Sequence, residues 1–113
     1  MRKTDKKIDN ELRLVLIDVY EQALKDITGF QWLTHLVNYD DYPNSLKVVC
    51  VFDTNANLNN YLQSEDNQGL VSLIQSEFKA MDIKLKRMVD HISYDTEENC
   101  HQQHHGNWAL RLG

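Results

Sequence analysis

Residues that build linkers and disulfide frameworks are scarce in this sequence. Its 113 residues include one proline, four glycines and two cysteines. Because flexible linkers are rich in glycine, serine or proline, we expect a single domain over residues 1–113. Two cysteines do not make a disulfide framework. Cys50 and Cys100 fit a reducing compartment, in which Cys50 serves as a small buried hydrophobe.

Long apolar runs are also missing. No stretch approaches the roughly 20 apolar residues that cross a bilayer. Residues 1–10 are polar and lack the apolar segment of a signal peptide. We therefore expect a cytoplasmic protein without a membrane association.

Positive charge is outnumbered by negative charge. The chain has 12 Lys and Arg against 17 Asp and Glu, a net charge of −5. This balance disfavours extensive phosphate binding, which needs clustered basic side chains. One local cluster, Lys84, Lys86 and Arg87, remains a candidate contact for nucleic acid, with ordinary solvated surface as the alternative.

Apolar periodicity predicts the secondary structure. Spacings of three and four residues indicate helices over 5–28 and 68–81 and a short helix over 55–63. Alternating or continuous apolar residues indicate four strands, over 30–39, 46–52, 83–94 and 107–112. The strand over 46–52 is apolar on both faces and is predicted to be central. A polar loop is predicted over 95–105.

This order of elements predicts an α+β fold. The order is α-β-β-(short α)-α-β-β, in one domain. The short turn at 40–45, with Pro43, favours an antiparallel hairpin. We therefore expect a four-stranded, mainly antiparallel sheet with the helices packed on one face.

A cluster of metal-ligating residue types lies in the predicted loop over 95–105. Cys100, His101, His104 and His105 carry side chains that bind zinc and other transition metals. If the segment were helical, residues four apart would share a face. The C-x-x-C half of a zinc finger is missing, so a solvated polar loop is the alternative. No other cofactor is expected.

Acidic residues near strand ends suggest a second kind of metal site. Asp53 ends a predicted strand, and Asp82-Ile83-Lys84 begins another. Asp53, Asp82 and Lys84 would suit a metal-dependent hydrolase or nuclease. Glycine-rich phosphate loops and the G-x-S-x-G elbow are both absent.

Three stretches carry a resemblance to a known family: MRKTDKKIDNELR, GFQWLTHLVNYDDYPNSLKVVCVFDTNANL and GNWALRLG. Together they resemble a family of small bacterial proteins of unknown function. Some of its members are labelled Fis-type transcriptional regulators, which would imply DNA binding through a C-terminal helix-turn-helix. The C-terminal third of this chain is instead predicted as strands, so no functional residue is carried over.

Aromatic residues without catalytic geometry favour an interaction protein. Trp32, Tyr42 and Trp108 lie in or near predicted strands, and sheet edges are natural pairing surfaces. The leading hypothesis is a non-enzymatic interaction or regulatory domain that binds a protein partner or forms a homodimer. The alternatives are a nucleic-acid-binding regulator that uses Lys84, Lys86 and Arg87, and a metal-dependent hydrolase or nuclease.

Overall fold

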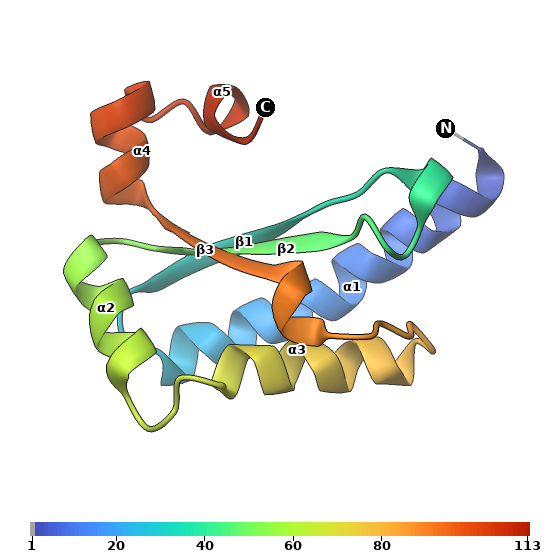
Figure 1. The fold of residues 1–113 in the computed structure, drawn as a ribbon, viewed down its shortest axis with the longest axis horizontal. Helices are drawn as coiled ribbons and strands as arrows, with labels where there is room; N and C mark the ends of the chain where they lie inside the picture. Colours follow the sequence, from blue (N-terminus) through green and yellow to red (C-terminus); the bar gives the residue numbers. More distant parts are fainter. Residues whose placement is uncertain (1) are drawn as a thin grey trace.

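The computed structural model describes residues 2–113 as an α+β domain built around one small sheet (Figure 1). Its elements in chain order are α1 (Lys3–Asp26), β1 (Phe30–Leu36), η1 (Tyr39–Asp41), β2 (Lys47–Phe52), α2 (Asn55–Gln63), α3 (Gly69–Ala80), η2 (Met88–His91), β3 (Ile92–Thr96), α4 (Glu97–His104) and α5 (Trp108–Leu112). None of the helices among these residues combines the length and the apolar character that a bilayer crossing requires.

The sheet has three strands in the order β1-β2-β3. β1 and β2 form the antiparallel hairpin that the short turn predicted, and β2 is the central strand, as its two apolar faces indicated. β3 pairs with β2 in parallel. The chain can make this parallel pair because α2 and α3 carry it back across the sheet between the two strands.

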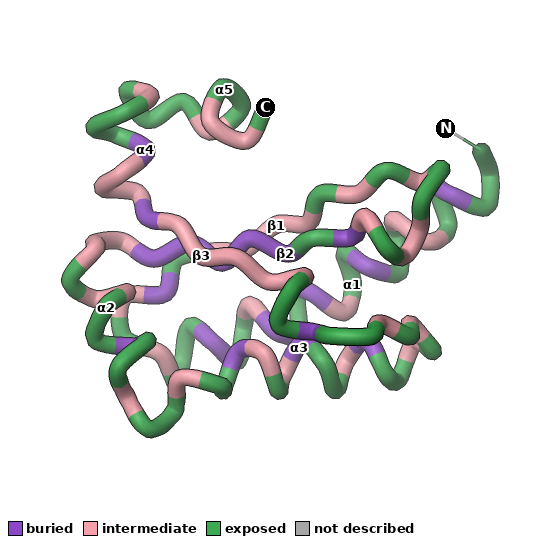
Figure 2. Tube along the Cα trace, viewed as in Figure 1, coloured by how far each residue is buried: buried purple, intermediate pink, exposed green. Residues whose placement is uncertain are grey.

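Two helices cover one face of the sheet and build the core (Figures 1 and 2). α1 and α3 pack side by side beneath the strands, as the predicted apolar stripes of these helices require. Most buried core members come from α1, α3 and the strands, and among them are Leu12, Leu16, Val19, Phe30, Val48, Cys50, Phe52, Leu70, Ile74 and Phe78. Cys50 and Cys100 are free and buried.

The predicted strand over 83–94 is wrong for most of its length. Residues 83–87 form no regular element, residues 88–91 form η2, and only residues 92–96 form a strand. α3 ends with Asp82 in the left-handed conformation (φ 61°), and the N–H of Ile83 donates to the carbonyl of Phe78. This Schellman-type ending turns the chain away from the sheet, so the apolar Ile83 and Leu85 pack on the core from a loop.

The predicted loop over 95–105 contains the helix α4. The Thr96 hydroxyl accepts the N–H of Asn99 and caps the first turn. His105 (φ 53°) and Gly106 (φ 81°) end the helix in left-handed conformations. A capping residue before Glu97 and a glycine after His105 are the sequence signals that predict this helix, and the polar composition of the segment obscured them.

The predicted last strand over 107–112 is the short helix α5. The Asn107 side chain accepts the N–H of Leu110 and starts the helix. Five residues with alternating apolar side chains fit either structure, and only the absence of a neighbouring strand decides between them. The four-stranded, mainly antiparallel sheet is therefore replaced by a three-stranded mixed sheet in residues 2–113.

Helices lie on both sides of the sheet rather than on one. Figure 1 shows α4 and α5 on the side opposite to α1 and α3. The second face of β2 carries Val49 and Val51, which are both buried. Trp32 pairs with Val51 across the hairpin and therefore shares its face, where it meets Trp108 of α5.

Candidate interaction surface

The free edge of β1 lies beside a groove on the α1 side of the sheet. β1 pairs only with β2 in the described sheet, so its other edge has no strand partner. A groove of about 460 Å³ lies between this part of β1 and α1. The residues that line it are Asp9, Arg13, Leu16, Ile17, Tyr20, Leu33, Thr34 and His35.

A hydrogen-bonded carboxylate holds one end of this groove in place. Asp9 Oδ1 accepts a bond from the Tyr39 hydroxyl (2.7 Å) and pairs with His35 Nε2 (2.8 Å). Asp9 Oδ2 lies 3.1 Å from Arg13 Nε. The bonds from His35 and Tyr39 lower the pKa of Asp9. The i,i+4 pair of Asp9 and Arg13 follows from sequence spacing, whereas only the tertiary structure adds His35 and Tyr39.

Apolar side chains of α1 extend the groove into an exposed surface. Leu14, Ile17 and Leu24 are 65%, 50% and 45% exposed. Spacings of three and seven residues place them along one side of the helix. The β1 edge, the groove and these three side chains together are called the edge surface below.

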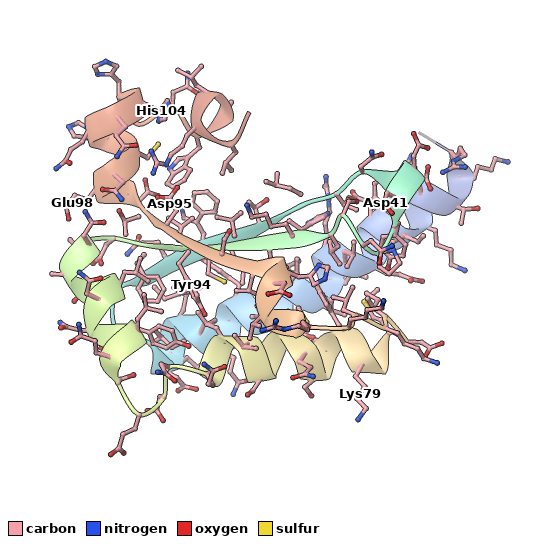
Figure 3. All side chains as sticks on the ribbon, viewed as in Figure 1. Asp41, Lys79, Tyr94, Asp95, Glu98 and His104 are labelled. Atoms are coloured by element: carbon pink, nitrogen blue, oxygen red, sulfur yellow. The ribbon has the colours of Figure 1, made fainter. Side chains whose placement is uncertain are left out.

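The two tryptophans meet on the other face of the sheet. The ring centroids of Trp32 and Trp108 are 4.8 Å apart with the rings nearly perpendicular. Glu97 accepts the indole N–H of Trp32 on Oε1 (2.6 Å) and that of Trp108 on Oε2 (2.9 Å). Arg111 binds both carboxylate oxygens of Asp95 and anchors α5 to β3. Figure 3 shows Asp95 on β3 at the base of α4.

Replacing Glu97 with glutamine tests this bridge. The glutamine amide offers one acceptor oxygen in place of two, so one indole N–H loses its partner. We expect Glu97→Gln to lower the free energy of unfolding by about 1–2 kcal/mol. Trp32 and Trp108 are the only tryptophans in the chain, so the intrinsic fluorescence spectrum should change as well.

Glu65→Gln is the matched control for this change. Glu65 is an exposed residue between α2 and α3, so its replacement alters the net charge equally without touching an indole. An unchanged spectrum and unchanged stability in Glu97→Gln, or equal changes in the two variants, would contradict the bridging role.

The sequence-predicted metal residues are not brought together as a ligand set. Cys100 is buried and burial raises the pKa of its thiol, while His101 and His105 are exposed. His104 Nδ1 lies 3.2 Å from the guanidinium of Arg111, a poor neighbour for a cation. Across residues 2–113 no group of three or more His, Cys, Asp or Glu side chains is placed to hold a metal ion.

The hydrolase candidates are separated in space. Asp53 follows β2, and its Oδ1 accepts the Thr54 N–H and the side-chain amide of Asn57, beside the Thr54 hydroxyl that caps α2. Asp82 follows the last turn of α3. Figure 1 places that end of α3 on the opposite side of the molecule from α2. Asp53 thus has a structural role and does not share a site with Asp82 and Lys84.

The basic candidates lie on a loop rather than on a strand. Lys84, Lys86 and Arg87 are exposed, and Arg87 lies 3.6 Å from Asp90. Tyr42, the third aromatic partner-binding candidate, is half-buried against the core, with its ring centroid 6.1 Å from that of Tyr39, and takes no part in the pairing of Trp32 with Trp108.

Sequence reasoning missed the edge surface and the Glu97 bridge. The exposed Leu14 and Ile17 interrupt the polar side of α1, and this irregularity in the apolar stripe was the available signal. For Glu97 there was none, because its two partners lie 65 and 11 residues away. Comparison of the chain with protein-family models, curated proteins and solved structures found no match.

Proposed function

We propose that this protein is a non-enzymatic interaction domain that binds a protein partner through the edge surface. The observation that carries this proposal is the exposure of Leu14, Ile17 and Leu24 on one side of α1, where Ile17 borders the groove beside the unpaired edge of β1. Exposed apolar side chains that line up beside a sheet edge are characteristic of docking surfaces. Polar groups at the groove end, Asp9 and Arg13, supply a rim.

The edge surface also differs from a second group of exposed apolar side chains. Leu62 and Val89 are exposed near the β3 edge of the sheet, but they come from separate segments and do not form a stripe on one element. Ile17 lies both in the groove and in the exposed stripe of α1. A charge at this position should therefore disrupt binding more than a charge elsewhere.

Ile17→Asp is the test of this proposal, with Val89→Asp as its control. Both side chains are about half exposed, so neither change should unfold the domain. We expect purified wild-type protein to form a complex, either with itself or with a co-purified protein, in light scattering and pull-down. Ile17→Asp should lose that complex because it places a charge in the apolar contact, and Val89→Asp should keep it. A wild-type monomer that retains no partner, or equal loss in both variants, would overturn the proposal.

A further inference from the structure

The exposed side of α1 is self-complementary about Ile17. Arg13 lies four residues before Ile17 and Glu21 lies four residues after it. Both are exposed. Arg13 is oriented by Asp9, and within residues 2–113 Glu21 takes part in no ion pair. Residues four apart on a helix share a face, so all three side chains lie along one line.

A two-fold axis through Ile17 pairs each of these side chains with one from a second helix. When two α1 helices pack antiparallel about such an axis, Ile17 meets its own copy at the centre. Arg13 of each chain then meets Glu21 of the other, which gives two opposite-charge pairs on either side of the apolar centre. Leu14 lies between Arg13 and Ile17 along the helix, and Leu24 extends the apolar contact beyond Glu21. Most other alignments of the two helices leave these charges unmatched.

We propose that a second copy of this chain occupies the edge surface, with the two-fold axis at Ile17 and with Arg13–Glu21 pairs between the copies. This inference rests on the proposed function and names its partner. The contact covers the three exposed apolar side chains of α1 and closes the groove beside β1. The interface is isologous, which means that both copies use the same surface. A substitution at Arg13 or at Glu21 therefore alters both ion pairs of the dimer.

Charge reversal gives this arrangement a specific signature. Arg13→Glu places two carboxylates opposite each other at both pairs, and Glu21→Arg places two guanidinium groups there. Like charges across an interface are strongly unfavourable, so each single variant should raise the dimer dissociation constant at least about tenfold. The double variant Arg13→Glu/Glu21→Arg restores both pairs and should dimerise as wild type does.

Mixing the two single variants is the sharpest arm of the test. In a mixed dimer the carboxylate introduced by Arg13→Glu faces the guanidinium introduced by Glu21→Arg, and the native Glu21 of the first chain faces the native Arg13 of the second. Both pairs are then attractive. Light scattering should therefore show twice the 13.3 kDa monomer mass for wild type, for the double variant and for the mixture. Each single variant alone should give the monomer mass at the same concentration.

The controls separate charge from folding. Lys79→Glu reverses an exposed charge on α3, which Figure 3 shows pointing away from the body of the molecule, and it should leave the dimer intact. Arg13→Glu removes the ion pair with Asp9, so circular dichroism should verify its fold. Glu21→Arg breaks no ion pair within its own chain. If Arg13→Glu does not fold, the mass of Glu21→Arg in light scattering tests the contact on its own.

Three results would overturn the inference: a wild-type monomer, dimers that persist in Glu21→Arg, or folded single variants that stay monomeric when mixed. A wild-type monomer that retains another protein, and loses it in Ile17→Asp, would reject the second copy as partner and leave the proposed function standing. A monomer without any retained protein would reject both.

Discussion

Phe52→Ala is expected to lower the free energy of unfolding by about 3–5 kcal/mol, the cost of removing a large buried aromatic side chain. Phe52 ends the central strand and is 0% exposed. Its ring packs against Phe30 of β1, Tyr61 of α2 and Tyr94 of β3, at centroid distances of 6.0, 5.4 and 6.5 Å. The alanine leaves a cavity at the point where these three elements meet.

The measurement is urea unfolding followed by circular dichroism. A small domain has a total stability of about 5–15 kcal/mol, so the alanine variant should lose a large part of it and unfold at a clearly lower urea concentration. Phe52→Leu is the control, because it keeps most of the apolar volume and should cost about 1.5 kcal/mol. Similar losses in both variants would contradict this expectation and show that the aromatic contacts, rather than the filled volume, account for the stability that Phe52 contributes.

Gly29→Ala is expected to cost about 3 kcal/mol, from a strained backbone and from steric overlap together. Gly29 follows the end of α1 with φ 86°, a conformation that L-residues rarely adopt. A Cβ there would lie 2.6 Å from Asn57 Cβ and 2.8 Å from Asp53 Oδ1. It would therefore displace the hydrogen bond from the Asn57 side-chain amide to Asp53 in the first turn of α2.

Gly106→Ala isolates the backbone contribution. Gly106 has a similar φ of 81°, but a Cβ there would meet no atom within 4 Å. We expect this variant to lose only about 1 kcal/mol, from the left-handed conformation alone. The difference between the two variants in thermal or urea unfolding then measures the close approach of Gly29 to α2. Equal losses would mean that α2 moves aside without cost.

Local signals in the sequence predicted the first two thirds of the fold. The apolar stripe that contains Leu12, Leu16 and Val19 defines α1, and the continuous run that ends at Phe52 defines the central strand. These segments are long and have strong apolar periodicity, so the local pattern and the tertiary contacts favour the same structure. The end of α1 was predicted two residues late: the helix ends at Asp26 with an extended Ile27 as its C-cap, and Gly29 lies in the turn that follows.

The last third failed because its segments are short and polar. Thr96 and Gly106 bound a helix whose first turn is rich in acidic and amide side chains, and such composition also describes a loop. Trp108, Leu110 and Leu112 alternate over too few residues to distinguish a strand from one turn of helix. In this region long-range partners, such as Asp95 for Arg111 and Glu97 for Trp108, determine the structure.

The α+β class, the two main helices, the β1–β2 hairpin and the central place of β2 could all be predicted from the amino-acid sequence. All of these follow from periodicity or turn chemistry within one segment. Only the tertiary structure decided the parallel pairing of β3, the position of α4 and α5 on the second face, and the edge surface. The physical reason is the same in each case: a strand partner, a covered face and an exposed side chain are properties of what the rest of the chain places nearby. Ile17 has the same apolar side chain as any core residue, and its exposure beside β1 is a property of the fold.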